Sequence, residues 1–258
     1  MNQSSILLAD WPAPENIHAF TTLRHGMGVS EAPFDEFNLG NRYSDQGDDP
    51  GAVEKNRDSL AREFSLPAKP HWLRQVHGVE VLRFDRAPES TGHFLHDEPV
   101  ADASVTSKKN VVLSVLTADC LPVLFCHQDG SEVAAAHAGW RGLADGMLEN
   151  TVGAMQGSPE KIMAWLGPAA GARAYEIGVD VRDAFIRHDP KASSAFFPTR
   201  ENHWKVDLYQ LARMRLHAMG VNKIFGGDHC TISEPDKFFS HRRDQRTGRM
   251  ASIIWMSA

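Results

Sequence analysis

The stretch that decides the fold class is "LPVLFCHQDGSEVAAAHAGWRG", residues 121–142. Two apolar runs, 121–127 and 132–138, flank the polar segment "QDGS", a pattern typical of neighbouring strands joined by a hairpin. His137 stands at the end of the second run, just before a glycine-flanked Trp-Arg pair. This histidine is either part of the core or part of a functional site.

Further apolar runs predict more strands, with helical patterns between them. We expect strands at 17–22, 79–84, 110–117, 161–167, 222–227 and 250–256. We expect helices from Asp49-Pro50 onward, over 143–156, over 179–189, and over 207–220 between a capping Asp207 and Gly220. The elements follow no regular strand–helix–strand order, and no Gly-rich phosphate-binding fingerprint is present. The sequence therefore predicts one α+β (mixed α/β) domain over 1–258, a layered sandwich with a mixed β-sheet.

Composition narrows the class of protein. A chain of 258 residues with 42% hydrophobic and 23% charged residues is typical of a soluble globular protein with an ample core. Its net charge of −6 argues against nucleic acid as a partner. The sequence shows neither a signal peptide nor an apolar run of about 18 residues that could span a membrane. Three cysteines do not form a disulfide framework, so we expect a cytoplasmic protein. We expect no membrane partner, and a monomer is the default expectation.

Three short segments place potential soft-metal ligands beside strand ends: "RQVHG" with His77, "TADCLPV" with Cys120, and "AAAHAGWRG" with His137. The hairpin could bring Cys120 and His137 to one rim of the sheet, whereas His77 must arrive from elsewhere in the fold. Two histidines and one cysteine suit zinc, with a fourth position open for water or substrate. The sequence therefore predicts a metal site of the catalytic kind.

A second interpretation keeps these residues without a metal. Cys120 would act as a nucleophile with His137 as its base, as in cysteine hydrolases. Asp119 would orient a histidine or act as an acid–base group.

Other histidine and cysteine pairs compete for a metal role: His93 with His96, Cys126 with His127, and His229 with Cys230. We expect the first pair in an exposed loop without a role, and Cys126 in the core. The third pair stands at a strand end, where packing is favoured over a supporting role.

Together and in this order, the three ligand segments resemble the signature of the YfiH-like family, often described as multicopper polyphenol oxidase or laccase-like. The likeness continues in "FNLGNRYSDQGDDPGAVEKNR", "GPAAGARAYEIGVDV" and "CTISEPDKFFSHRRDQRTGR". It implies a compact fold related to that of a deamidating bacterial toxin, with His77, Cys120 and His137 as metal ligands. It also implies phosphorolysis of adenosine, inosine, guanosine and methylthioadenosine, with deamination of adenosine.

Phosphorolysis requires a group that holds phosphate, and arginine binds phosphate bidentately while staying charged. The candidates for substrate binding are Arg141, Arg242, Arg243, Arg24 and Asn38. Arg141 is favoured because it follows His137 by only four residues. Trp140 could stack on a purine or belong to the core.

Rival functions remain. The ligand set also suits blue copper, so copper is an alternative metal. A multicopper oxidase needs many more histidines, commonly as His-x-His pairs, and the sequence contains no such pair. Laccase activity therefore ranks low. An amide hydrolase editing peptidoglycan precursors stays open, because the same zinc or Cys-His chemistry can cleave an amide. A non-enzymatic metal-binding protein is the remaining alternative.

Overall fold

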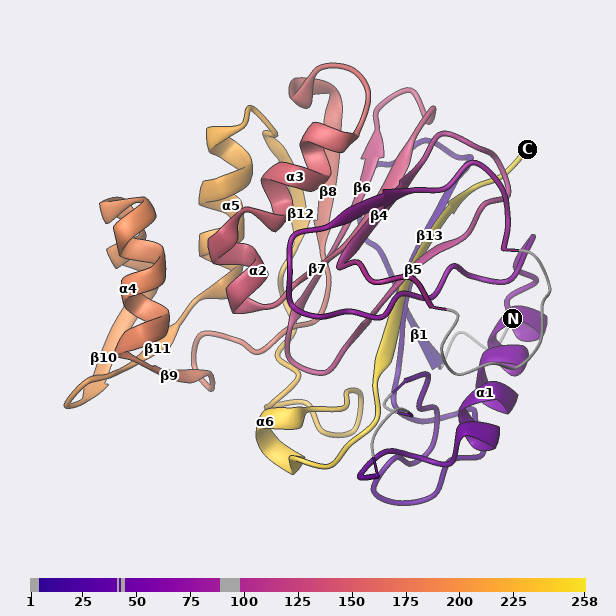
Figure 1. Cartoon of the computed structure of the whole chain (residues 1–258), viewed down its shortest axis with the longest axis horizontal. Helices are drawn as coiled ribbons and strands as arrows, with labels where there is room; N and C mark the ends of the chain where they lie inside the picture. The colour runs from indigo at the N-terminus through magenta and orange to yellow at the C-terminus, as the bar shows by residue number, and fades with distance from the viewer. Residues whose placement is uncertain (1–4, 41, 43–44, 89–97) are drawn as a thin grey trace.

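The computed structural model describes residues 5–40, 42, 45–88 and 98–258, and its strands form three sheets (Figure 1). The four-stranded sheet has the order β1 (Ile6–Leu8), β2 (Ile17–Thr22), β13 (Met250–Met256), β5 (Leu113–Thr117). The six-stranded sheet has the order β12 (Lys223–Gly226), β8 (Ile162–Leu166), β6 (Leu121–His127), β7 (Val133–Ala138), β4 (Ala103–Thr106), β3 (Val81–Arg83). The small sheet has the order β10 (Phe196–Arg200), β11 (His203–Val206), β9 (Glu176–Gly178).

Helices cover the outer faces of the two large sheets. The α-helices are α1 (Pro50–Glu63), α2 (Trp140–Asp145), α3 (Met147–Ala154), α4 (Val179–His188), α5 (Leu208–Ala218) and α6 (His241–Asp244). Two 3₁₀ helices span Pro159–Lys161 and Pro190–Ala195. Helices α2, α3 and α5 pack on the six-stranded sheet, and α1 packs on the far face of the four-stranded sheet. No helix in the described ranges is long and apolar enough to cross a membrane.

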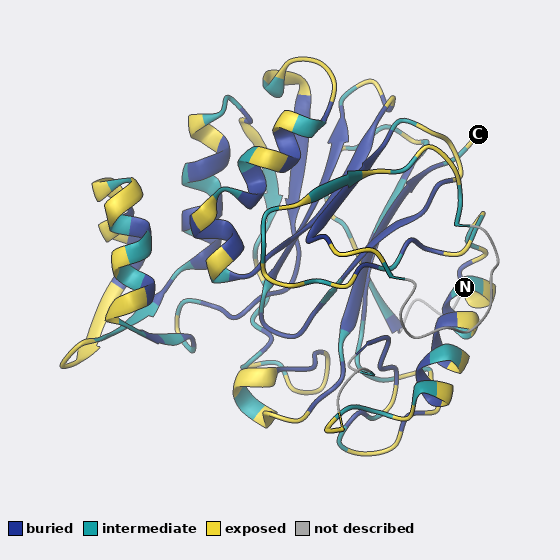
Figure 2. Ribbon diagram, viewed as in Figure 1, coloured by how far each residue is buried: buried dark blue, intermediate teal, exposed yellow. Residues whose placement is uncertain are grey.

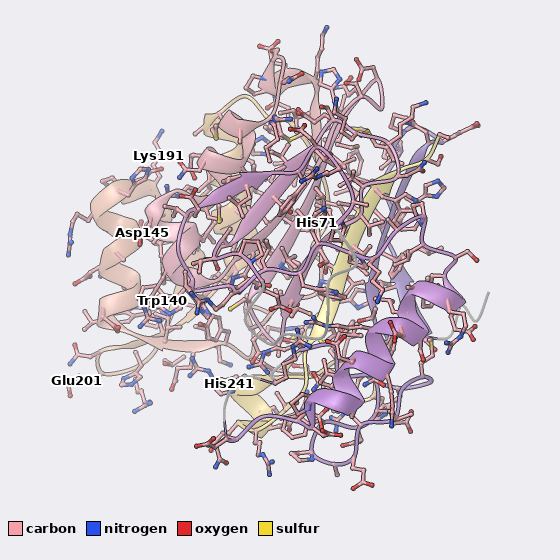
Figure 3. All side chains as sticks on the ribbon, turned by 45° about the vertical axis from the view of Figure 1, so that its right-hand side comes forward. His71, Trp140, Asp145, Lys191, Glu201 and His241 are labelled. Carbon is pink, nitrogen blue, oxygen red and sulfur yellow. The ribbon has the colours of Figure 1, made fainter. Side chains whose placement is uncertain are left out.

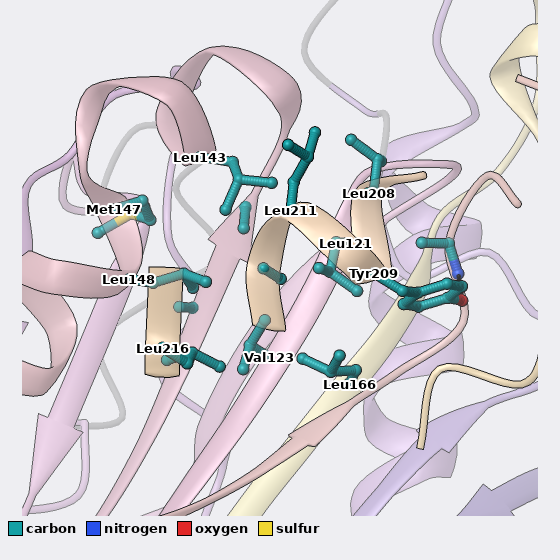
Figure 4. Packing of buried hydrophobic residues seen from close by; sticks show 14 of the residues in the cluster. Leu121, Val123, Leu143, Met147, Leu148, Leu166, Leu208, Tyr209, Leu211 and Leu216 are labelled. Carbon is teal, nitrogen blue, oxygen red and sulfur yellow. Dashed lines mark hydrogen bonds between the residues drawn. The ribbon is translucent and has the colours of Figure 1, made fainter. Parts of the chain in front are cut away.

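The β6–β7 hairpin lies at the centre of these layers and is buried on both faces (Figure 2). Because side chains alternate along a strand, Leu121 and Val123 pack against the helices (Figure 4), whereas Leu124 and Cys126 pack against the four-stranded sheet. Burial on both faces explains why the hairpin reads as continuous apolar runs. Each large side chain buried here stabilises the fold by about 1.5–3 kcal/mol.

The predicted α+β layered fold is confirmed. Strands β2, β6 and β13 have the expected bounds, and the Asp49 and Asp207 side chains accept hydrogen bonds from N–H groups in the first turns of α1 and α5. Only the β3–β4 and β8–β12 ladders are parallel within the described sheets. The helix expected over 143–156 is instead two helices, because Gly146 adopts φ +102° between α2 and α3. Five short strands escaped the sequence pattern: β1, β4, β9, β10 and β11.

The topology brings three chain positions to one edge of the six-stranded sheet. Strand β7 is antiparallel to both β6 and β4, so its end lies beside the beginnings of those two strands. His137 lies near the end of β7 and pairs with Pro122, while Cys120 directly precedes β6 and Asp102 directly precedes β4. These residues therefore meet at the same edge.

Candidate metal centre

His77, Cys120 and His137 come together at this edge, and their potential ligand atoms all lie within 4.8 Å of one another. The Sγ atom of Cys120 is 3.7 Å from Nε2 of His77, and the two imidazole rings meet edge to face with centroids 4.9 Å apart. His137 is buried, Cys120 is half-buried and His77 is exposed. The group could hold a metal ion, with a coordination position left open on the exposed side.

A buried carboxylate, Asp102, holds the loop that carries His77. Backbone N–H groups of three successive residues, Val76, His77 and Gly78, donate hydrogen bonds to its two oxygens at 3.1, 2.9 and 2.8 Å. His77 itself has φ +60°, a left-handed conformation that a residue other than glycine adopts at a cost. The carboxylate therefore compensates for a loop that would otherwise be unfavourable.

The same carboxylate orients His137. The Nδ1 atom of His137 lies 2.8 Å from Oδ1 of Asp102, and the backbone N–H of His137 donates to the Asp102 carbonyl oxygen at 2.7 Å. Because an ionised carboxylate only accepts hydrogen bonds, Nδ1 carries a proton, and Nε2 is the ring nitrogen left to bind a metal once its own proton has been released. Asp102 thus positions two of the three candidate ligands.

The electrostatics of the group favour the thiolate form of Cys120. Burial opposes ionisation, but His137 and His77 lower the pKa of Cys120 to about 6. Burial likewise disfavours the charged imidazole, yet Cys120 and Asp102 raise the pKa of His137 to about 9. The pKa of Asp102 is lowered because the bonds from His137 and the loop N–H groups outweigh its burial. Since the thiolate is the form of cysteine that binds metals, Cys120 is suited to a metal, whereas His137 must release a proton when a metal binds.

Two glycines of the "HAGWRG" segment allow α2 to approach the ligands. A Cβ atom at Gly139 would lie 2.8 Å from Cδ2 of His77 and 3.1 Å from Sγ of Cys120. A Cβ atom at Gly142 would lie 2.8 Å from the carbonyl oxygen of Gly78, in the loop that carries His77. The start of α2 is therefore packed directly onto the candidate metal centre.

We expect Gly139→Ala to weaken metal binding by about tenfold or more, because the new methyl group displaces two ligands. Gly139 has φ −60°, so the effect is steric and not one of backbone strain. Gly153→Ala in α3 is the matched control, since nothing lies within 4 Å of a Cβ atom there. Competition for the metal with a chromogenic chelator measures both affinities. Equal affinities for the two variants would contradict the close approach seen here.

The predicted substrate-binding side chains fall into two groups, of which the first faces a pocket. Arg141 and Arg242 line a pocket of about 320 Å³ together with Trp140 and Tyr175. The Arg141 guanidinium lies 4.3 Å from the centre of the Trp140 ring, and that of Arg242 lies 4.9 Å from the centre of the Tyr175 ring. One face of the Trp140 indole is therefore covered by an arginine.

The second group holds loops in place. Arg243 donates to the carbonyl oxygens of Thr231 and Phe238, at 2.7 and 3.0 Å. Arg24 forms an ion pair with Asp35 at 3.2 Å. These two guanidinium groups already bind backbone carbonyl oxygens or a carboxylate of the protein.

The side chains of Asn38 and Asp119 also form hydrogen bonds within the protein. Asn38 is fully buried, and its side-chain oxygen accepts hydrogen bonds from the N–H groups of Gly40 and Arg249. The Asp119 carboxylate accepts a hydrogen bond from the Thr231 hydroxyl at 2.6 Å and another from the backbone N–H of Arg242 at 2.6 Å. The role of orienting a histidine, suggested by the sequence for Asp119, is filled by Asp102. A catalytic role for Asp119 stays a prediction.

Two of the competing pairs, Cys126 with His127 and His229 with Cys230, do not belong to this group. Cys126 is fully buried between the two large sheets, and burial raises its pKa to about 12, so its predicted core position is confirmed. His127 contacts Asp129 through Nδ1, and His229 contacts Glu234. Cys230 accepts a hydrogen bond from the N–H of Gly171. His93 and His96 lie outside the described residues.

Sequence reasoning missed three residues near the centre. Asp102 is the first. Tyr175 is buried, and its pKa is raised by burial and by the neighbouring Cys120. Burial lowers the pKa of Arg249, against the opposing charges of Cys120 and Asp119. Tyr175 and Arg249 lie in two of the segments that carry the family likeness, whereas no motif marks Asp102. That all three lie near Cys120 depends on packing between distant segments, which the sequence does not show.

The layered α+β fold and its three-ligand group define a protein with one open candidate metal centre among the described residues. Residues 18–257 match the family model described as "Multi-copper polyphenol oxidoreductase laccase", and the chain belongs to this family, the YfiH family. The resemblance found in the sequence is thereby confirmed.

Curated relatives and solved structures cover nearly the whole chain. A Xylella fastidiosa (strain Temecula1) protein named purine nucleoside phosphorylase is 56% identical over 255 residues, 98% of this chain and 97% of that protein. The Escherichia coli K12 protein named purine nucleoside phosphorylase YfiH is 50% identical over 253 residues, 98% of this chain and 99% of that protein. A crystal structure of a Neisseria meningitidis protein, 46% identical, superposes with a TM-score of 0.89 over 98% of this chain and 100% of that chain. The Bacillus licheniformis hypothetical protein YfiH, 30% identical, superposes with a TM-score of 0.88 over 99% and 98%.

Proposed function

We propose that this chain is a metal-dependent purine nucleoside phosphorylase and that its metal is zinc. The observation that carries the proposal is the group of His77, Cys120 and His137, with the tautomer of His137 fixed by Asp102. Two imidazoles and one thiolate with an open side match the ligand sets of catalytic zinc. Relatives at 50–56% identity that carry the name purine nucleoside phosphorylase support the reaction class.

The residues of the site have separable tasks in this proposal. His77, Cys120 and His137 hold the ion, and Asp102 keeps the two histidines in place. When bound, zinc supplies a Lewis acid for the activation of water, which is the chemistry that deamination of adenosine at C6 requires. We include this deamination as a side activity. Exposed His77 marks the side from which a nucleoside reaches the ion.

Laccase chemistry fits the site less well, although the family description names it. A trinuclear copper cluster requires many more histidines than the three ligands gathered here. Among the histidine, cysteine and acidic side chains that the structure describes, one group, that of His77, Cys120 and His137, has metal-binding geometry. Copper remains a candidate occupant of that single group.

We expect the purified protein to contain about one zinc ion per chain and to convert inosine plus phosphate to ribose 1-phosphate plus hypoxanthine. Removal of the metal with a chelator should abolish this activity, and added zinc should restore it. Elemental analysis and a product assay before and after chelation measure both. Release of ammonia from adenosine tests the deaminase activity.

Three results would each redirect the assignment. Phosphorolysis by metal-free protein would overturn the metal-centred proposal. Release of an amino acid from a muramyl peptide without turnover of nucleosides would favour the amide hydrolase. Several copper ions per chain with rapid oxidation of phenols would favour the laccase.

A further inference from the structure

A polar pocket of about 320 Å³ lies beside the candidate metal centre. Its walls are the start of α2, the small sheet with the start of α4, and α6 (Figure 1). Figure 3 labels Trp140, which lines the pocket, together with Glu201 in the turn between β10 and β11 and His241 at the start of α6. Its lining residues are Trp140, Arg141, Tyr175, Glu176, Ile177, Gly178, Asp180, Val181, Arg200, His203 and Arg242.

Two of the three arginines in the pocket have no acidic partner among the described residues. Arg200 pairs with Glu176 at 2.8 Å, but neither Arg141 nor Arg242 forms an ion pair with an acidic side chain in the described part of the chain. Each of the two instead lies over an aromatic ring, Trp140 or Tyr175. A ring below a guanidinium holds its plane. Arg242 also hydrogen-bonds the Tyr175 side chain, and the five N–H donors of a guanidinium leave others for an oxyanion.

Both arginines are anchored to residues next to a metal ligand. Arg141 follows Gly139 by two residues, and Gly139 is packed against His77 and Cys120. The backbone N–H of Arg242 donates to the Asp119 carboxylate, and Asp119 directly precedes Cys120. Both side chains line the same pocket, so an anion bound there would lie near the candidate metal centre.

We propose that this pocket binds the phosphate that attacks the nucleoside, with Arg141 and Arg242 as its two bidentate partners. The proposal rests on the phosphorylase function proposed above. In the reaction, an oxygen of monohydrogen phosphate forms a bond to C1′ of the ribose as the C1′–N9 bond breaks. The electron pair of that bond leaves with the purine, which takes up the proton of the phosphate. The phosphate of the product, ribose 1-phosphate, then occupies the same two arginines.

The kinetic test compares Arg141→Lys and Arg242→Lys with Arg182→Lys. Lysine keeps the charge but loses the planar fork, so each pocket variant should raise the KM for phosphate about tenfold or more. The KM for inosine and the metal content should change less than about twofold. Arg182 is a matched control because it also lies over a tryptophan, Trp204 at 4.9 Å, but does not line the pocket. A wild-type KM for phosphate in both pocket variants would overturn the proposal.

A binding measurement separates failure of this pocket from failure of the proposed function. Titration calorimetry with inorganic phosphate should show binding to the metal-loaded protein and a loss of about tenfold or more in each pocket variant. If the wild-type protein binds phosphate through these arginines but does not cleave inosine, the pocket stands and the phosphorylase function fails. If inosine is cleaved and phosphate binds to both variants as tightly as to the wild-type protein, the function stands and the pocket assignment fails.

Discussion

Cys120→Ala should yield a folded protein that retains no metal and has no measurable phosphorolysis of inosine. Cys120 supplies the only thiolate of the three-ligand group, and its Sγ lies 3.7 Å from Nε2 of His77. Changes to partners outside the ligand set typically cost 10–100-fold in metal affinity, so loss of a ligand itself should cost more. Because Cys120 is half-buried at the sheet edge and not in the core, the fold should tolerate alanine.

The control is Cys230→Ser, which removes the other half-buried cysteine and leaves an acceptor for the N–H of Gly171. This variant should bind metal and cleave inosine as the wild-type protein does. Metal content by elemental analysis and ribose 1-phosphate production are measured on the same preparations. Wild-type phosphorolysis by metal-free Cys120→Ala protein would exclude a mechanism centred on a metal.

Cys120→Asp distinguishes a ligand from a nucleophile. A carboxylate can bind zinc but cannot act as the thiolate of a cysteine hydrolase. A metal-centred enzyme should therefore keep part of its metal affinity and a measurable activity in this variant. Full metal content without any activity would favour the interpretation in which Cys120 attacks the substrate.

The hairpin explains why part of the site could be predicted from the sequence. Antiparallel strands joined by a short turn bring the start of one beside the end of the other, so Cys120 and His137 had to share an edge. His77 could not be placed in this way. It reaches the group through a loop held by Asp102, which precedes β4. That strand has only four residues, ASVT, which alternate between apolar and small polar side chains and are all buried, so a pattern this short does not stand out in the sequence.

The arginines show a second limit of prediction from sequence. The sequence favours Arg141 for its position close to His137 but does not rank Arg24, Arg242 and Arg243 against one another. In the fold, Arg243 donates to backbone carbonyl oxygens and Arg24 pairs with a carboxylate. Arg141 and Arg242 instead lie over aromatic rings at a pocket. These differences arise from contacts between segments far apart in the chain. A local pattern therefore cannot reveal them.

Asp102→Asn should weaken metal binding by about 10–100-fold and lower the melting temperature of the metal-free protein as well. The amide can satisfy the Nδ1–H of His137 only through its oxygen. Its NH₂ group would then face N–H groups of the loop at Val76 and Gly78, which donate to the other carboxylate oxygen at 3.1 and 2.8 Å. At least one buried donor is left without an acceptor, which costs about 1–3 kcal/mol. Both the loop of His77 and the tautomer of His137 therefore lose their support.

Asp129→Asn is the matched control, because Asp129 also pairs with a histidine, His127, but at the exposed far end of the same hairpin. That variant should keep metal affinity and activity unchanged. Chelator competition measures the affinity of each variant, and thermal unfolding with and without zinc separates loss of fold from loss of the site. A role for Asp102 in positioning the ligands predicts that the stabilisation by zinc shrinks along with the affinity. If Asp102→Asn only lowers the melting temperature and binds zinc as tightly as the wild-type protein, the carboxylate supports the loop but does not orient the ligands.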